Sequence, residues 1–372
     1  MMLKFPFYAR LALTLLAVVL VVFILFIGRN IFIPLVFGLL IGILLFPLSL
    51  VFERKLHVGR GVASALSVTL FLSMAGSFIY FMALQIGQFA RDIPELKKRF
   101  QQIAWEIQKW VAYKFQINTS IQNDYFERSA GDIVQTAARS ASEAVFTVIG
   151  VVVMFVFVFI FAFFMLYHYK FLMRFVLHLF NVRHREKVHE VVMETKTMIN
   201  GYVMGLVIEM VIMIVVNSGL LLLLDIRYAI LLGVMAAVLN IIPYFGIYVS
   251  IVLTMLVTLA NNTPGHAMQA GLALFIVHVL DANILMPRIV GSRVKMNPFV
   301  TIIAVIIGEA VWGVPGMFLF IPLTGIMKMV CDRVEGLEAW GMLMGVEEAP
   351  KPKKKLVLDV SVPGGADNNM VK

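Results

Sequence analysis

The sequence has few charged residues and almost no cysteine. Charged residues make up 14% of its 372 residues, whereas a soluble protein carries about 25%. The single cysteine, Cys331, excludes an internal disulfide. Hydrophobic residues make up 61% of the chain, and the mean hydropathy is +0.92. The scarcity of charge therefore predicts a protein that resides in a lipid bilayer.

Motifs for catalysis and for nucleotide or metal binding are also lacking. The chain has no glycine-rich nucleotide loop, no Walker lysine, no His-Glu-x-x-His sequence and no cysteine pair. The four histidines between residues 168 and 200 do not have the spacing of zinc ligands. We therefore expect no enzyme, no cofactor and no metal site. The net charge of +9 does not indicate a nucleic-acid partner, because the basic residues lie in short loops and the tail beside apolar segments.

Eight apolar segments predict an all-α polytopic membrane protein. Six of them have the length of a full span, which needs about 20 residues. The six ranges are 9–27, 31–52, 61–85, 144–167, 201–224 and 268–286.

The other two apolar segments, 228–260 and 299–330, have a different pattern. Each is about 32 residues, or roughly 48 Å as a continuous helix, whereas the hydrocarbon layer is ~30 Å thick. Glycine and proline interrupt both segments at the centre, within Asn240–Gly246 and Trp312–Gly316. Each half is too short to span the layer comfortably. This pattern predicts two re-entrant helical hairpins that enter and leave on the same side of the membrane.

Basic residues predict the orientation. The short loop 53–60 is basic and therefore cytoplasmic, which places the amino terminus inside. If 228–260 were one kinked span, the basic residues after the next span would lie outside. If 228–260 is a hairpin, these basic residues are cytoplasmic, and so is the lysine-rich tail. The hairpin arrangement therefore satisfies the positive-inside rule at both basic clusters. These two clusters are Arg288, Arg293 and Lys295, and residues 351–355. We expect both termini in the cytoplasm and a location in the inner membrane.

The chain divides into five regions. Span, hairpin, span and hairpin follow one another with opposite sides of insertion, which is the inverted-repeat pattern of a transport unit. In the polar region after the third span, Asp92 and Pro94 are start signals for a separate amphipathic helix. That helix would cover its own bundle, lie on the membrane or contact a neighbouring subunit. The regions are 1–85 (three scaffold spans), 86–142 (extracytoplasmic amphipathic helices), 143–200 (fourth span and cytoplasmic basic linker), 201–330 (transport unit) and 331–372 (cytoplasmic, partly disordered basic tail).

Polar residues inside the apolar segments are the candidates for function, because each is costly at membrane depth unless it faces protein or water. Glu209 and Glu309 are the candidates for ion coupling. If the hairpin tips meet near the midplane, their residues would surround a small polar solute or an ion. Otherwise Asn240 caps a half-helix, Tyr244 and Trp312 are packing aromatics, and Asp281 pairs with a nearby arginine. The candidate binding residues are Asn240, Pro243, Tyr244, Gly246, Asp281, Asn283, Glu309, Trp312, Gly313 and Gly316.

Four motifs in the second half occur in the order of a known family. They cover Asn240–Gly246, Asp281–Gly291, Lys295–Val300 and Gly313–Gly316. This ordered set resembles the AI-2E family of bacterial membrane transporters, named for export of autoinducer-2. The resemblance implies an inner-membrane protein that moves small solutes, and a pentamer with an elevator-like movement. For some members it implies exchange of sodium or lithium for protons.

Three functions remain open. We expect a secondary transporter that exports autoinducer-2 or a similar small polar solute. The second is a Na⁺(Li⁺)/H⁺ antiporter, favoured by the lone glutamates but opposed by the lack of an adjacent pair of buried aspartates. The third is a non-transporting scaffold that recruits partners through region 86–142.

Two positions depart from the family pattern. Ile247 replaces a common proline, and Glu309 replaces a common small residue.

Overall fold

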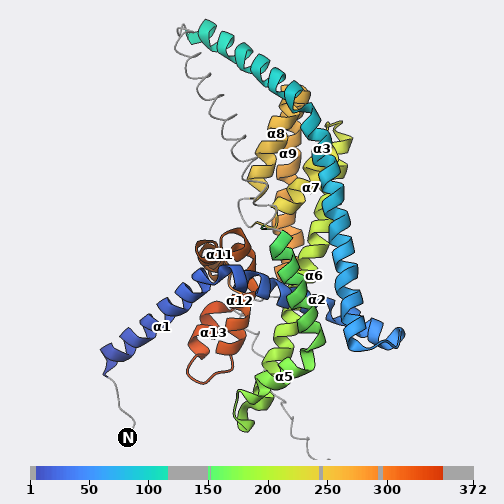
Figure 1. Cartoon of the computed structure of the whole chain (residues 1–372). Coiled ribbons are helices and arrows are strands. Elements are labelled where there is room, and N and C mark those ends of the chain that lie inside the picture. The colour runs from blue at the N-terminus through green and yellow to red at the C-terminus, as the bar shows by residue number, and fades with distance from the viewer. Residues whose placement is uncertain (1–5, 116–149, 151, 243–245, 292–295, 347–372) are drawn as a thin grey trace, which may run out of the picture.

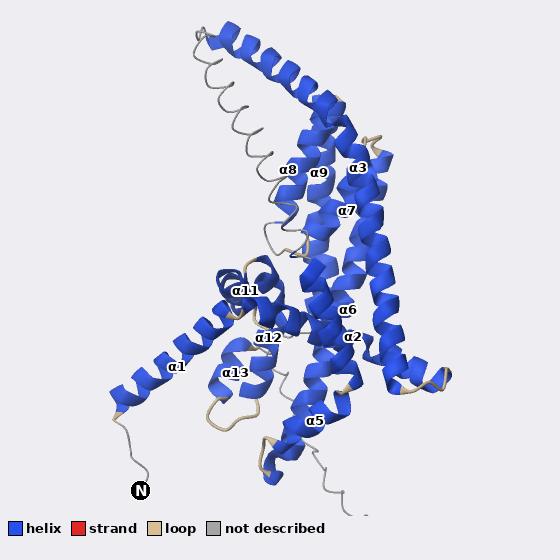
Figure 2. Ribbon diagram, in the orientation of Figure 1, coloured by secondary structure: helices blue, strands red, loops and turns tan. Residues whose placement is uncertain are grey.

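The protein is helical throughout the part that the structure describes. The computed structural model describes residues 6–115, 150, 152–242, 246–291 and 296–346. Within these ranges Figure 2 shows no strand, and the only extended pairing is an isolated bridge between Met296 and Gly345. Six described helices are long and apolar enough to cross a membrane, and a bent pair can supply a seventh. The prediction of an all-α polytopic membrane protein is confirmed.

The helices carry the labels of Figure 1. An unlabelled helix, Val152–Tyr167, precedes α5 and corresponds to the expected fourth span. The labelled helices are α1 (Phe7–Ile27), α2 (Arg29–Lys55), α3 (Arg60–Phe115), α5 (Tyr169–His178), η1 (Val182–His184), α6 (Arg185–Leu223), α7 (Ala229–Leu239), α8 (Gly246–Asn261), α9 (Pro264–Leu280), the π-helical turns η2 (Asp281–Leu285) and η3 (Pro287–Gly291), α11 (Pro298–Trp312), α12 (Val314–Cys331) and α13 (Glu338–Met344).

Helix α3 is much longer than the expected third span. It has 56 residues, which corresponds to about 84 Å of helix. The part of α3 suited to cross a membrane, Arg60–Glu95, ends next to Asp92 and Pro94, where a separate helix was expected to begin. The helical structure nevertheless continues through both residues. Figure 1 shows that α3 changes direction toward its C-terminal end. Pro94 accounts for such a bend, since it lacks an N–H group and its ring crowds the preceding turn.

The segment 228–260 forms a helical hairpin. Helices α7 and α8 are joined at Gly246, where an added Cβ would lie 1.6 Å from the carbonyl oxygen of Leu239. Only glycine permits this approach. Arg227 Nη1, just before α7, donates to Asn261 Oδ1, the last residue of α8, at 3.4 Å. The two ends of the segment thus lie together, whereas one kinked span would separate them. Its re-entry into a membrane stays a prediction.

The segment 299–330 forms a second helical hairpin, from α11 and α12. Gly313 joins the two helices with φ of +65°, a conformation that glycine adopts without a steric penalty. An added Cβ on Gly308 would lie 2.3 Å from the carbonyl oxygen of Gly316. The two helices therefore pack backbone against backbone near their turn.

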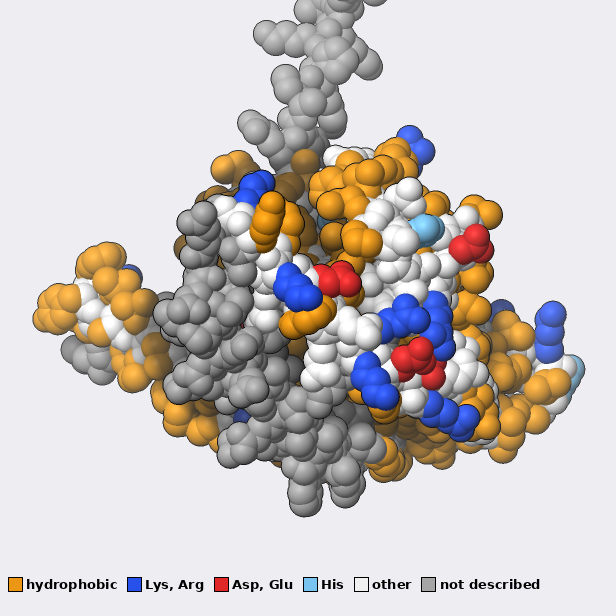
Figure 3. Space-filling view, turned by 90° about the horizontal axis from the view of Figure 1, so that it is seen from above, with side chains coloured by type: hydrophobic (Ala, Val, Ile, Leu, Met, Phe, Trp, Pro, Cys, Tyr) orange, Lys and Arg blue, Asp and Glu red, His pale blue; other side chains and the backbone are white. Residues whose placement is uncertain are grey.

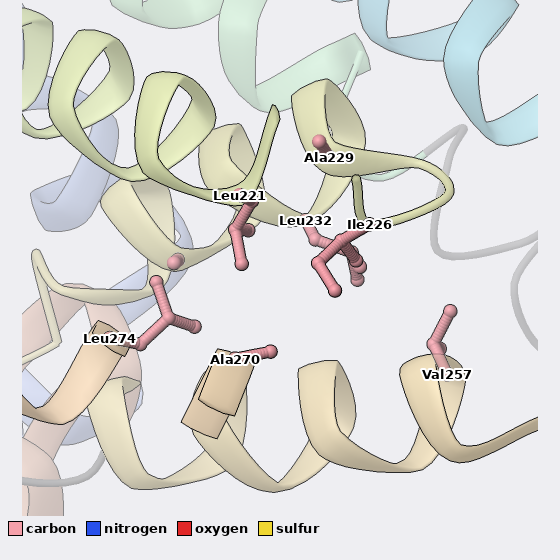
Figure 4. Packing of buried hydrophobic residues seen from close by; sticks show 8 residues of the cluster. Leu221, Ile226, Ala229, Leu232, Val257, Ala270 and Leu274 are labelled. Carbon is pink, nitrogen blue, oxygen red and sulfur yellow. The ribbon is translucent and has the colours of Figure 1, made fainter. Parts of the chain in front are cut away.

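One apolar cluster joins hairpin α7–α8 to its neighbours. Figure 4 shows Leu221 of α6, Leu232 of α7, Val257 of α8 and Leu274 of α9 directed toward a shared interior. Fully burying one such side chain is worth about 1.5–3 kcal/mol. This cluster holds the hairpin between α6 and α9.

The open end of hairpin α7–α8, opposite its turn, is attached to α3. Asp92 accepts hydrogen bonds from Arg227 Nη2, at 2.6 Å, and from the hydroxyl of Tyr228. Figure 3 views the bundle from the upper end of Figure 1 and shows acidic and basic side chains together, with hydrophobic side chains around them. The α2–α3 loop, α5 and α13 lie toward the opposite end (Figure 1).

Candidate functional site

Three polar side chains, of which Glu209 and Asp281 are buried and Asn240 is half-buried, come from three separate parts of the chain. Glu209 is on α6, Asn240 directly follows α7, and Asp281 begins η2. Each lies three or four residues, about one helical turn, from one member of a buried apolar cluster. That cluster consists of Met213, Ala237 and Val277. The three polar residues therefore form one layer next to the cluster, and this set is called the polar layer below.

Hydrogen bonding satisfies the polar layer only in part. Asn240 Nδ2 donates to Asp281 Oδ2 at 2.9 Å. The exposed fractions of Asp281 and Glu209 are 3% and 7%. Asp281 Oδ1 and Glu209 Oε2 are buried and have no hydrogen-bond partner within the described part of the chain. Buried polar atoms are normally paired, so two acceptor positions in this layer are open to a ligand, a proton or water.

The two acids of the polar layer also act on each other. The carboxyl groups of Glu209 and Asp281 are close enough for electrostatic repulsion. His278 lies one turn before Asp281. No group of three or more His, Cys, Asp or Glu side chains suited to a metal ion occurs among the described residues. Repulsion between neighbouring carboxylates inside a protein favours binding of a proton or a small cation between them.

The backbone at Asp281 has an unusual conformation with a local cause. Asp281 begins two successive π-helical turns, η2 and η3. Pro287 cannot donate a backbone hydrogen bond to the preceding turn. The amide of Asn283 donates to the carbonyl oxygen of Val279 at 2.7 Å and competes with the α-helical ladder there. Single π-helical turns occur frequently at functional sites, and here they directly follow the α-helical end at which the buried carboxylate lies.

The structure does not gather all the expected binding residues at one point. Glu309 is exposed on α11, and Asn283 is exposed beyond Asp281. Gly246 forms the close approach in the first hairpin, while Gly313 and Gly316 shape the turn of the second. Pro243 and Tyr244 lie outside the described residues.

Trp312, at the second tip, is buried far from the polar layer. Its Nε1 donates to the carbonyl oxygen of Leu25 in α1 at 2.9 Å. Its side chain belongs to the same buried cluster as Ile199 of α6. Ile199 and Glu209 are ten residues apart, or about 15 Å along the helix. The two hairpin tips are therefore associated with different levels of α6.

A row of buried hydroxyl groups on α8 was not among the expected residues. Ser250, Thr254 and Thr258 are each about 1% exposed. Their spacing of four residues places them on one face of the helix, and this spacing was readable in the sequence. Thr258 Oγ1 is buried without a partner among the described residues, whereas Ser250 Oγ bonds the carbonyl oxygen of Ile247.

Comparison with known proteins covers nearly the whole chain. The sequence profile described as AI-2E family transporter matches residues 13–336, which confirms the resemblance expected from the motifs. YhhT of Escherichia coli (strain K12), named as a candidate transport protein, is 24% identical over 338 residues, 88% of this chain and 91% of YhhT. YrrI of Bacillus subtilis (strain 168), named likewise, is 22% identical over 81% of this chain and 86% of its own. The AI-2 transport protein TqsA of E. coli (strain K12) is 28% identical over 32% of this chain and 35% of its own.

Proposed function

This chain belongs to the AI-2E family of transporters, and on that basis we propose that it is a secondary transporter that exports AI-2 or a similar small polar solute. It is not an enzyme under this proposal, and it binds no nucleic acid. The name of one relative, an AI-2 transport protein, supports the choice of solute. The family membership supports transport over a scaffold without transport activity.

The observation that carries this proposal is the polar layer. A scaffold has no need of two acids and an amide at the centre of an apolar bundle, where each carries a free-energy cost. All three residues lie on helices of the region 201–330. Asp281 Oδ1 and Glu209 Oε2 accept no hydrogen bond from the described residues. They are suited to accept hydrogen bonds from the hydroxyl groups of a small polar solute.

An elevator-like movement of region 201–330 against a scaffold of the first four spans would carry this layer across the membrane. Helix α1 has no buried residue in the single chain. A helix with such an apolar surface must be covered by lipid or by another subunit. This surface supports a homo-oligomer, and the family resemblance supports a pentamer in the inner membrane.

A second candidate function is exchange of Na⁺ or Li⁺ for protons. The sequence has no adjacent pair of buried aspartates, but Glu209 and Asp281, from separate helices, are near enough to interact electrostatically. Carboxylate oxygens are ligands of hard cations, and two neighbouring carboxylates can hold either a cation or a proton. The pair thus supports cation coupling, either as the transport reaction itself or as its driving force.

Flux through proteoliposomes tests both functions. Purified protein should move AI-2 under the first proposal and give sodium-dependent proton movement under the second. Glu209→Gln and Asp281→Asn should each lower the active flux at least tenfold, because each removes one carboxylate and keeps the side-chain volume. Glu190→Gln is the matched control, since Glu190 is exposed at the start of α6, and it should keep the flux. Folded protein with neither activity would overturn both proposals in favour of a scaffold.

A further inference from the structure

A large cavity lies beside the N-terminal part of α6, away from the polar layer. Its volume is about 1410 Å³, and residues of α2, the fourth span, α5, α6 and α12 line it. The lining residue of α6 nearest to Glu209 is Ile199. Ten residues of helix, about 15 Å, separate the two. The cavity is therefore a different site from the proposed transport site. Its apolar wall includes Leu39, Phe46, Met173, Val176, Val188 and Ile326.

The charged residues around this cavity are mostly basic. Five Lys and Arg side chains line it, whereas Glu335 is the single acidic lining residue. Arg333 forms an ion pair with Glu194 at 2.5 Å. The ammonium group of Lys196 lies 3.3 Å from the ring centroid of Phe46. The five basic residues are Lys170, Arg174, Lys187, Lys196 and Arg333.

Lys187 has no counter-ion among the residues that the structure describes. It forms no ion pair or hydrogen bond with any described residue. Together with Lys196, whose amine faces a ring and not an acid, it leaves two positive charges uncompensated at the cavity. These charges favour an anionic ligand.

Helix α5 forms one wall and has the features of a helix at a membrane surface. It is bent by 75° from the helix Val152–Tyr167, so it does not continue the direction of that span. Met173 and Val176 face the cavity, while Phe171 and Phe175 are exposed. Aromatic residues beside basic ones on a short helix are typical of the layer between headgroups and acyl chains.

We propose that this cavity binds an anionic phospholipid. The acyl chains would lie along the apolar wall, and the anionic headgroup would lie beside the basic residues, with Lys187 and Lys196 supplying the uncompensated positive charge. Basic pockets between membrane helices are known to bind such headgroups. A free phosphate would use only the charges, and a neutral lipid only the apolar wall, whereas an anionic lipid uses both. The site is additional to the proposed transport function and does not depend on it.

Native mass spectrometry of the full-length protein in detergent tests this proposal. Dioleoylphosphatidylglycerol should be retained more tightly than dioleoylphosphatidylcholine. Lys187→Gln should weaken its binding about fivefold, and the double variant with Lys196→Gln about 25-fold, at about one kcal/mol per charge. Lys55→Gln is the matched control, because Lys55 is exposed and does not line the cavity. It should bind the lipid as the parent does.

A second variant separates a lipid from a free anion. Val188→Trp fills part of the apolar space of the cavity without changing its charge, so it should weaken binding of the anionic lipid. Inorganic phosphate at millimolar concentration should not displace the lipid. Equal retention of both lipids, an equal loss in Lys55→Gln, or displacement by phosphate would overturn the proposal. Thermal unfolding confirms that each variant is folded, and transport activity does not enter the readout.

Discussion

Asn240 Nδ2 donates a hydrogen bond to Asp281 Oδ2 at 2.9 Å, across 41 positions of sequence. This bond connects the end of α7, at the turn of the first hairpin, to the first π-helical turn after α9. Both residues are at the centre of apolar segments, and Asp281 is almost fully buried. The amide therefore supplies a hydrogen bond that compensates part of the cost of burying the acid.

Asn240→Ala should destabilise the protein because it leaves Asp281 Oδ2 without a donor. A buried acceptor that loses its partner costs about 1–3 kcal/mol. The free energy of unfolding in detergent measures the loss. Asn283→Ala is the matched control, since Asn283 is exposed and bonds only its own helix. Equal stability of the two variants would show that the bond to Asp281 contributes nothing.

The contact between α6 and α7 leads to a second prediction. An added Cβ on Gly233 would lie 2.4 Å from Ser218 Oγ and 2.5 Å from its backbone nitrogen. Gly233→Ala should therefore force the helices apart, and such overpacking typically costs about 1–3 kcal/mol. In Gly219→Ala nothing lies within 4 Å of the added Cβ, so this control should be neutral or gain up to about 1 kcal/mol. Thermal unfolding measures the difference, and equal midpoints for the two variants would contradict the close contact.

The sequence predicted the turns of the two helical hairpins better than it predicted the contacts between helices or the length of α3. The turns near Gly246 and Gly313 were predictable because local backbone geometry needs glycine there. Asn240 and Asp281 were both expected at the site. Their direct bond was not, since the two residues are 41 positions apart in sequence and only the packing of the helices brings them together. A sequence gives the depth of Glu309 in a helix but not the direction of its side chain. The length of α3 was missed because Pro94 is read as a start signal, although a long helix can accommodate it with a bend.

Tyr228 leads to a prediction about pH. Its partial burial, together with its hydrogen bond to Asp92, raises the pKa of Tyr228 to about 12 from its ordinary value of 10.0. The protonated hydroxyl is the form that donates this bond. Since the pKa is higher in the folded state, the contribution to stability is complete below pH 10 and is lost as the pH rises to about 12.

Tyr228→Phe should therefore lower the unfolding temperature at pH 8, and the difference from the parent should shrink between pH 10 and pH 12. Scanning fluorimetry across this range provides the measurement. Tyr248→Phe serves as the control, because Tyr248 is exposed and its hydroxyl has no hydrogen bond to another described residue. A difference that stays constant up to pH 12 would rule out this role for the Tyr228 hydroxyl.

Trp312 determines how α1 is attached to the second hairpin. No residue of α1 is buried in the single chain, so the bond from Trp312 Nε1 to the carbonyl oxygen of Leu25 is an important part of its attachment. Trp312→Phe removes this bond and keeps an aromatic ring beside Phe320, whose centroid lies 5.3 Å away. The loss should be about 1 kcal/mol in the free energy of unfolding. Trypsin should also cut faster after Arg29, at the junction of α1 and α2.

Trp340→Phe is the control, because Trp340 is exposed on α13. It should change neither the free energy of unfolding nor the rate of cleavage. Unchanged cleavage in Trp312→Phe would mean that other contacts, such as those of neighbouring subunits, hold α1 in place.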